Sequence, residues 1–275
     1  MKISVVMQSY LSEYKGSRED PVEKFNRSVE SFLMQDHDDK ELIIVSDGCE
    51  ITNNTYELEW SMFDNIKLIK TDKEPNRWVG SKRNYGIEAA DGEWITYLDS
   101  DDIIIETRLS DLYKSIQENP TAKSIMSNGN ELYPLHAINK SNSNKTKSTG
   151  IKIWGNPKGW LFVNGRKIHC SKLDDYLEYI TRHEKQTDIK LTTVGSIEIF
   201  DTIYKYRYAP NNHIGKPVWG TSRISHRKDI ASRWPSFIGR GEDCLFAKDI
   251  HAEGECYMSD AATYMVCHVP NTFDI

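Results

Sequence analysis

The chain has 275 residues, of which 38% are hydrophobic and 11% aromatic, enough for a folded core and inconsistent with a disordered chain. No apolar run approaches the roughly 20 residues that span a bilayer, and the N-terminus turns polar too soon for a signal peptide. Five cysteines form no Cys-x-x-Cys pair and leave one over from any disulfide pairing. We therefore expect an unexported cytoplasmic protein with no transmembrane segment.

The net charge of −6 argues against a nucleic-acid partner, but the charge is unevenly distributed. Residues 134–235 contain 18 Lys and Arg against 8 Asp and Glu, so this stretch carries +10 and the remainder carries −16. The same stretch is rich in aromatic side chains: Trp154, Trp160, Phe162, Tyr204, Tyr206, Tyr208 and Trp219. A basic, aromatic-rich region therefore sits inside an acidic chain.

Four apolar runs in the first hundred residues have strand length and no clean alternation, at residues 3–7, 42–45, 66–69 and 94–98. This pattern is typical of parallel strands covered on both faces. Helical patterns separate the runs: one begins with Asp20 as N-cap, Pro21 and a capping-box Glu23, and another covers about 81–90 and stops at Gly92 as a left-handed cap. The alternation predicts an α/β fold with a mostly parallel sheet.

After a third predicted helix at 106–119 the alternation ends. Residues 139–150 are polar and of low complexity, which indicates a surface loop, and we expect it to close over bound substrate as a lid. Asn164 and Gly165 between two short apolar runs predict a β-hairpin, and 173–184 has the pattern of a further helix. No repeat or linker divides the chain.

Three carboxylates, Asp99, Asp101 and Asp102, directly follow the fourth predicted strand. Like charges this close need neutralisation, and oxygen ligands favour Mg²⁺ or Mn²⁺ over zinc. An acidic turn that only caps the next helix explains the same residues equally well.

A second acidic pair, Glu242 and Asp243, follows two glycines late in the chain. Carboxylates on a flexible loop suit a general base, whereas an acidic first turn of a helix at 244–251 is the simpler interpretation. Asp47 and Gly48 end the second strand, where a ligand at the sheet edge would lie, although such a pair is most often just a turn.

Together, the order and spacing of these segments resemble the family 2 glycosyltransferases with the GT-A fold. The resemblance rests on Ser-Phe-Leu-Met-Gln at 31–35 before the strand at 41–48, and on Gly-Ser-Lys-Arg-Asn-Tyr-Gly-Ile at 80–87. It continues through Ala-Asp-Gly-Glu-Trp-Ile at 90–95, a DXD motif in residues 98–102 and an ED motif at Glu242 and Asp243. The match covers 1–120 and about 217–268, and it implies a Rossmann-like layered αβα fold.

The resemblance also implies roles for these residues. Donor-binding positions are Ser9, Tyr10, Asp47, Arg83 and Asp99; metal positions are Asp99, Asp101, Asp102 and His268; catalytic positions are Asp243 as general base and Glu242. Within the donor set, Asp47 would contact the base or ribose of a nucleotide-sugar and Arg83 the diphosphate. His268 is equally explained as a surface residue after a strand. Ser46, and Gln8 with Ser9 and Tyr10, depart from the commoner family residues, so the nucleotide is left open.

The resemblance implies a single GT-A domain over 1–275, with a nucleotide-sugar-binding half at 1–105 and an acceptor-binding half at 106–275 that contains the basic, aromatic-rich insert at about 134–216. The expected activity is metal-dependent, inverting transfer from a nucleotide-diphosphate sugar, with Mn²⁺ or Mg²⁺, to a hydroxyl of a glycan or lipid-linked sugar. The insert also suits a modified base in DNA as acceptor. A non-catalytic nucleotide-sugar-binding module and a nucleotidyltransferase are the alternatives from other classes.

Overall fold

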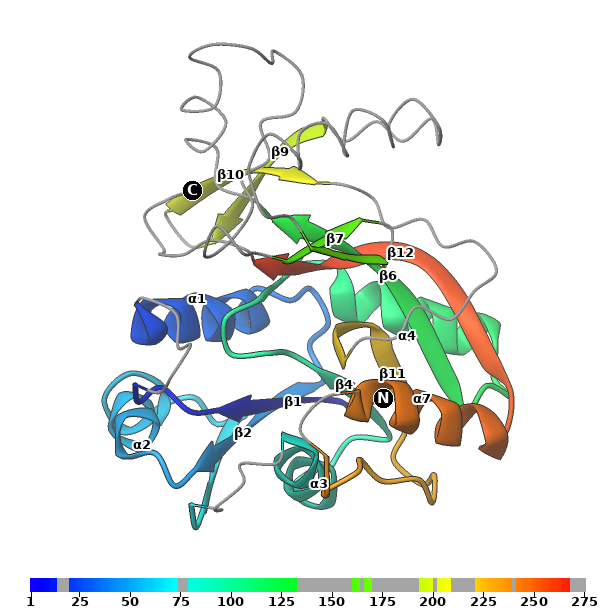
Figure 1. The fold of residues 1–275 in the computed structure, drawn as a ribbon, viewed down its shortest axis with the longest axis horizontal. Helices are drawn as coiled ribbons and strands as arrows, with labels where there is room; N and C mark the ends of the chain where they lie inside the picture. The colour runs from blue at the N-terminus through cyan, green and yellow to red at the C-terminus, as the bar shows by residue number, and fades with distance from the viewer. Residues whose placement is uncertain are drawn as a thin grey trace.

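The computed structural model describes residues 1–13, 20–73, 79–132, 160–163, 166–169, 193–199, 202–208, 221–238 and 241–267. Its centre is an eight-stranded sheet with the order β3-β2-β1-β4-β11-β6-β12-β5 and helices on both faces (Figure 1). This arrangement confirms the layered α/β fold expected from the alternating sequence pattern. Within the described parts of the chain, no helix combines the length and apolar character needed to cross a bilayer.

The four predicted strands form one parallel half of the sheet: β1 (Ile3–Ser9), β2 (Lys40–Asp47), β3 (Ile66–Thr71) and β4 (Trp94–Tyr97). Strands β1 and β2 are buried along nearly their whole length, as their unbroken apolar runs predict. Strand β3 is at the edge of the sheet and is mostly half-buried, so the expectation of cover on both faces is wrong for this strand.

The connecting helices are α1 (Pro21–Leu33), α2 (Glu50–Thr55) with the π-helical η1 (Tyr56–Trp60), α3 (Val79–Ala89) and α4 (Arg108–Glu118). Figure 1 shows α1 on one side of β1 and β2 and α3 on the other. Each side has its own apolar cluster. Phe25 and Phe32 of α1 pack with Leu109 of α4 in one cluster, while Ile87 of α3 packs with Phe246 in the other.

The second half of the chain adds β5 (Ile103–Ile104), β6 (Ser124–Leu132), the 3-10 turn η2 (Thr221–Arg223), β11 (Ile224–Arg227), α7 (Glu242–Glu253) and β12 (Cys256–Cys267). Strand β11 is antiparallel to both β4 and β6, whereas β6 and β12 run parallel and side by side (Figure 1). The sheet is therefore parallel on its N-terminal side and mixed beyond β4.

Two hairpins lie outside the main sheet. Strands β7 (Trp160–Val163) and β8 (Arg166–His169) pair antiparallel with Val163 opposite Arg166, which confirms the predicted hairpin. Strands β9 (Thr193–Ile199) and β10 (Thr202–Tyr208) form the other. The predicted lid at 139–150 and helix at 173–184 lie outside the described residues.

Two local sequence expectations are wrong in detail. Asp20 occupies the N-cap position of α1, but it is left-handed, with φ of 51°, and its side chain makes no capping hydrogen bond. Gly92 is not left-handed; a Cβ there would lie 2.6 Å from Ser4 Oγ and 2.8 Å from the Lys2 carbonyl oxygen. The glycine is thus required for close approach to β1 and not for a helix cap.

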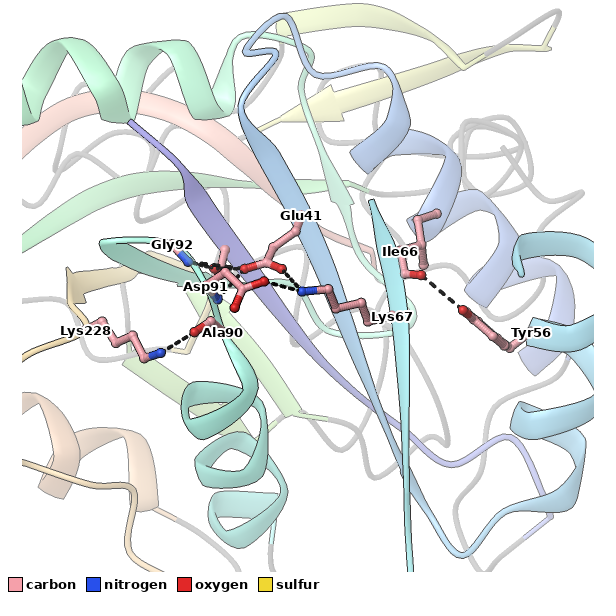
Figure 2. Close-up of polar contacts among 9 residues, drawn as sticks. Glu41, Tyr56, Ile66, Lys67, Ala90, Asp91, Gly92 and Lys228 are labelled. Atoms are coloured by element: carbon pink, nitrogen blue, oxygen red, sulfur yellow. Dashed lines mark hydrogen bonds and ion pairs between the residues drawn. The ribbon is translucent and has the colours of Figure 1, made fainter. Parts of the chain in front are cut away.

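A buried carboxylate ties the starts of the parallel strands to the turn after α3 (Figure 2). Glu41 Oε1 accepts hydrogen bonds from Ser4 Oγ at 2.5 Å and from the Asp91 backbone N–H at 2.6 Å, and Oε2 pairs with Lys67 Nζ at 2.7 Å. Burial alone would raise the pKa of Glu41, but the hydrogen bonds from Lys67, Ser4 and Asp91 hold it below its usual value. Glu41 therefore stabilises the fold as an anion.

Replacing Glu41 with Gln removes this charge, and we expect the free energy of unfolding at neutral pH to fall by about 2 kcal/mol, the scale of hydrogen bonds to charged groups. Because the folded pKa is depressed, the contribution is present above the unfolded pKa and is lost as the pH falls through the folded pKa. Denaturant unfolding measured from neutral to acidic pH should show the free energies of unfolding of wild type and Glu41→Gln converging in acid. Exposed Glu88→Gln serves as the control, and equal stabilities of wild type and Glu41→Gln at neutral pH would contradict the assignment.

Candidate functional site

The carboxyl ends of the parallel strands carry the polar residues singled out by the sequence. Ser9 ends β1, Asp47 ends β2, and Asp99 follows β4 after one residue. Since β1 pairs in parallel with both β2 and β4, these three positions lie together at the carboxyl ends of the strands. These ends are where open α/β sheets bind their ligands.

Asp47 is buried and forms an ion pair with a cation from helix α3. Its Oδ1 lies 2.9 Å from Lys82 Nζ, and both side chains are under a tenth exposed. Lys82 also donates to Thr71 Oγ1 at 3.2 Å, at the end of β3. The predicted nucleotide-contacting aspartate therefore lies beside a lysine that the sequence interpretation did not single out.

Arg83, the next residue of α3, connects the two acidic motifs. One guanidinium nitrogen, Nη2, lies 3.3 Å from Asp99 Oδ1, and the other, Nη1, lies 3.3 Å from Glu242 Oε1. Arg83 itself is only 4% exposed. The structure thus brings the DXD segment and the late acidic pair together through one buried cation, although Glu242 is 159 residues from Arg83 in sequence.

Helix α1 and Gln35, which follows it, hold the backbone of residues 98–105, a segment that includes the short strand β5 and is called the acidic loop below. Arg27 Nη2 donates to the Asp101 carbonyl at 3.0 Å, and Ser28 Oγ to the Asp99 carbonyl at 3.0 Å. Gln35, two residues past the end of α1, donates from Nε2 to the Ile105 carbonyl at 2.8 Å while its Oε1 accepts from the Leu109 N–H at 3.1 Å. The loop is therefore fixed by the side chains of Arg27 and Ser28 on α1 and of Gln35 just after it.

Asp102 points back into the fold. It is buried, and its Oδ2 accepts a hydrogen bond from the hydroxyl of Tyr264 on β12 at 2.8 Å. The same Tyr264 oxygen accepts the Asp99 backbone N–H at 3.0 Å. Tyr264 thereby links the acidic loop to β12. Burial, together with the Asp102 and Asp99 charges, raises the pKa of its hydroxyl well above its usual range.

Asp99 has a raised pKa because its surroundings disfavour the anion. Desolvation is the largest cause, Arg83 opposes it, and the negative charges of Asp101 and Glu242 add to it. A cation placed among these carboxylates would relieve that repulsion, and their oxygens are the ligand type that Mg²⁺ and Mn²⁺ prefer.

Within the described ranges, no three acidic, histidine or cysteine side chains form a ready-made metal cage. Magnesium is commonly held by one or two carboxylates together with substrate phosphates and water, so two carboxylates fit such an ion without a cage. The residues present at 99 and 101 are therefore compatible with the implied cation.

Helix α7 begins at the late acidic pair. Gly241 is its N-cap, with φ of 79°, a left-handed conformation that favours glycine. Glu242 and Asp243 occupy the first turn, where the unpaired backbone N–H groups and the helix dipole stabilise negative charge. The helical first turn and a pairing with Arg83 coexist here, so the simpler interpretation of these acids does not exclude the chemical one.

The remaining predicted site residues are placed as follows. The Ser9 hydroxyl is fully buried and lies 3.1 Å from Thr52 Oγ1, and Tyr10 is half-buried against the core cluster on the α1 side. His268 follows the last residue of β12 and lies outside the described residues.

Three neighbours of the site were missed by the sequence interpretation: Lys82, Tyr264 and Trp234. Lys82 belongs to the segment 80–87 that carries the family resemblance, and the two adjacent cations near the start of α3 are a local signal for it. Tyr264 and Trp234 carry no local signal, because the side-chain hydrogen bonds that tie them to the site reach residues more than a hundred positions away.

Comparison with known proteins adds independent findings. The family model described as Glycosyl transferase family 2 matches residues 20–165. An uncharacterized glycosyltransferase of Haemophilus influenzae is 31% identical over 129 residues, covering 46% of this chain and 46% of that protein. The glucosyl-dolichyl phosphate glucuronosyltransferase of Haloferax volcanii is 29% identical over 125 residues, covering 46% of this chain and 37% of that protein. The chain thus spans about half or less of these relatives.

Solved structures share the fold. S. aureus TarS 1–349 in complex with UDP-GlcNAc superposes with a TM-score of 0.55 at 17% identity, covering 97% of this chain and 58% of that one. The mannosyltransferase PcManGT of Pyrobaculum calidifontis, in complex with GDP-Man and Mn²⁺, gives a TM-score of 0.51 at 11% identity, covering 96% of this chain and 56% of that one.

The contact of Gln35 with the acidic loop can be tested with Gln35→Ala. The variant takes away the side-chain partner of the Leu109 N–H, while the Ile105 carbonyl keeps its hydrogen bond from the Arg108 N–H, so we expect the free energy of unfolding to fall by about 1–3 kcal/mol. Gln117→Ala, an exposed change on α4, should alter it by less than about 0.5 kcal/mol. Denaturant unfolding measures both, and indistinguishable midpoints would show that the contacts do not hold the loop.

Proposed function

The chain belongs to glycosyl transferase family 2, and from this premise we propose that it transfers a sugar from a nucleotide-diphosphate donor to an acceptor hydroxyl with inversion, using a divalent metal. The observation that carries the proposal is the Arg83 bridge. It joins Asp99 of the acidic loop to Glu242 of the late acidic pair, and this supports placing the proposed donor site next to the proposed base.

The donor site is proposed at the carboxyl ends of β1, β2 and β4. Asp47 would contact the base or ribose, Arg83 the diphosphate, and Asp99 the ribose side of the metal site, with Ser9 and Tyr10 lining the end of β1. Structures of the same fold in complex with UDP-GlcNAc and with GDP-Man support a nucleotide-sugar as the ligand class. A guanidinium suits a diphosphate because its N–H groups pair with two oxygens at once.

The metal would be held by Asp99 and Asp101, with Asp102 and His268 as further expected ligands. When bound, Mn²⁺ or Mg²⁺ supplies positive charge for the leaving diphosphate. The Tyr264 hydroxyl already occupies one oxygen of Asp102, so the ligand proposal rests more heavily on Asp99 and Asp101. A neighbour of this fold is in complex with Mn²⁺, which supports the same class of ion.

The chemistry is a single displacement. Asp243 takes the proton of the acceptor hydroxyl while the hydroxyl oxygen forms a bond to the anomeric carbon. The bond from that carbon to the diphosphate oxygen breaks on the opposite face. The diphosphate leaves with the electron pair and its developing charge falls beside Arg83. Glu242 positions the acceptor or its loop, and no covalent sugar-enzyme intermediate forms.

The acceptor is proposed to be a glycan or a lipid-linked sugar, which the lipid phosphate in the name of the Haloferax volcanii relative supports. A modified base in DNA is the second candidate, because the basic, aromatic-rich stretch suits a polyanion with stacking groups. A non-catalytic nucleotide-sugar-binding module would need no base, yet the acidic pair lies beside the DXD loop. Transfer is therefore favoured over binding alone.

Donor binding should depend on metal and on Asp101. We expect UDP, GDP, CDP or TDP with Mn²⁺ to raise the melting temperature of the wild type, and EDTA or Asp101→Asn to abolish the shift. Asp64→Asn, an exposed change near β3, should leave it intact. If none of the four diphosphates with metal stabilises the wild type, the carboxylates at 99 and 101 are structural and the proposal fails.

Transfer should depend on Asp243. Nucleotide release from UDP- and GDP-sugars with Mn²⁺, measured with glycan and with modified-DNA acceptors, would identify the acceptor that accelerates it. With that acceptor, Asp243→Asn should lower kcat by about 10²- to 10⁴-fold, the usual contribution of a general base, while donor binding persists. Asp249→Asn, exposed on the same helix, is the control. Unchanged kcat in Asp243→Asn would assign the base to another residue and revive the nucleotidyltransferase alternative.

A further inference from the structure

Arg83 has a third partner besides its two carboxylates. Its guanidinium carbon lies 4.4 Å from the centre of the Trp234 ring, a cation–π contact with a buried indole. Ion pairs from two carboxylates to the two terminal nitrogens of one guanidinium do not by themselves fix the tilt of its plane. A ring face supplies the missing restraint, because arginine stacks on aromatic faces.

Trp234 is itself held from several directions. The Asn84 side chain brackets its backbone, donating to the Trp234 carbonyl and accepting the Trp234 N–H, both at 2.9 Å. Phe246 of α7 stacks on the ring with a centroid distance of 4.1 Å. Because Asn84 follows Arg83 on α3, and Phe246 shares α7 with Glu242, the indole packs against both elements that meet at the guanidinium.

The edge of the indole is fixed by a buried hydrogen-bond chain. The Trp234 indole N–H donates to the Tyr97 hydroxyl at 2.7 Å, and that hydroxyl lies 2.7 Å from His226 Nε2. His226 Nδ1 lies 2.8 Å from the Arg227 carbonyl, which can only accept, so Nδ1 carries the proton and Nε2 accepts from Tyr97. Burial lowers the pKa of His226 to about 4, which keeps the ring neutral and this direction of donation intact.

We propose that Trp234 is a positioning residue: its indole sets the orientation of the Arg83 guanidinium between Asp99 and Glu242, and thereby the geometry offered to the donor diphosphate. This inference rests on the proposed function for its consequence in binding. The contact between indole and guanidinium is a separate, physical claim. Trp234 acts through Arg83 and touches neither donor nor acceptor in this scheme.

The test uses Trp234→Phe, which keeps a ring and loses the indole N–H, and Trp234→Leu, which removes the ring. Trp60→Phe is the matched control, since Trp60 is also buried, donates its indole N–H to Asn26 Oδ1 at 3.0 Å, and lies in the other apolar cluster. All variants are made in the full chain, and their folding is checked by circular dichroism.

The first readout is the NMR signal of the Arg83 guanidinium, identified by its absence in Arg83→Lys. A proton above an aromatic face is shifted upfield by the ring. We expect the wild-type upfield shift to be reduced in Trp234→Phe, lost in Trp234→Leu and unchanged in Trp60→Phe. An Arg83 signal that is the same in wild type and both Trp234 variants would overturn the proposal, whatever the protein's activity.

The second readout is calorimetric affinity for UDP, GDP, CDP and TDP with Mn²⁺. Trp234→Leu should bind the preferred diphosphate about three- to thirtyfold more weakly, and Trp234→Phe should recover most of the loss, as expected for a cation–π contact. In the Arg83→Lys background, Trp234→Leu should weaken binding little further, because both changes remove the same contact between guanidinium and indole.

The outcomes separate the two claims. If the wild type binds none of the four diphosphates, the proposed function fails while the NMR signal still decides the Trp234 contact. If the wild type binds one of them and folded Trp234→Leu binds it equally well, the positioning role is overturned. If Trp234→Leu does not fold, the reduced shift and modestly weaker binding expected of Trp234→Phe decide the proposal in its place.

Discussion

Two adjacent cations on helix α3 neutralise the carboxylates that converge at the carboxyl ends of the parallel strands. Successive residues of a helix point about 100° apart, so Lys82 reaches Asp47 at the end of β2 while Arg83 reaches Asp99 and Glu242. Without these cations the like charges at the sheet edge would repel one another. The position of α3 is therefore the constraint on which the geometry of the site depends.

Close packing fixes α3 in that position. A Cβ at Gly86 would lie 2.3 Å from a methyl carbon of Val6 on β1, and one at Gly80 would lie 2.0 Å from the Pro235 carbonyl oxygen. The helix thus presses directly on the sheet and on the segment that carries Trp234. On the opposite face, Arg27 and Ser28 of α1, together with Gln35 just past its end, hold the backbone of the acidic loop. The site is held from both faces of the sheet before any ligand arrives, which is the preorganisation that binding and catalysis need.

Much of this architecture is encoded locally and was predictable. The apolar runs, helix patterns and acidic segments placed β1 to β4, α1, α3 and α4, and the order of the motifs indicated the family that the family model then matched. The edge position of β3, the left-handed Asp20 and the packing role of Gly92 were not predictable, because each depends on neighbours supplied by tertiary structure. The hydrogen bonds from Trp234 to Tyr97 and from Tyr264 to Asp102 span more than 130 residues, so no window of sequence contains them. The assigned chemical roles remain predictions.

The contacts of Glu41 with Ser4, Lys67 and Asp91 lie at the other end of the same strands. Glu41 is six residues before Asp47 on β2, which at about 3.3 Å per strand residue separates the two by about 20 Å. Changes more than about 10 Å apart that share no partner usually have additive energies. The Glu41 contacts, which contribute to stability, therefore lie at the starts of the strands, and the proposed ligand site lies at their ends. A chain built this way can gain or lose stability at one end of the strands while the opposite end keeps its geometry, which leaves the two ends open to independent selection.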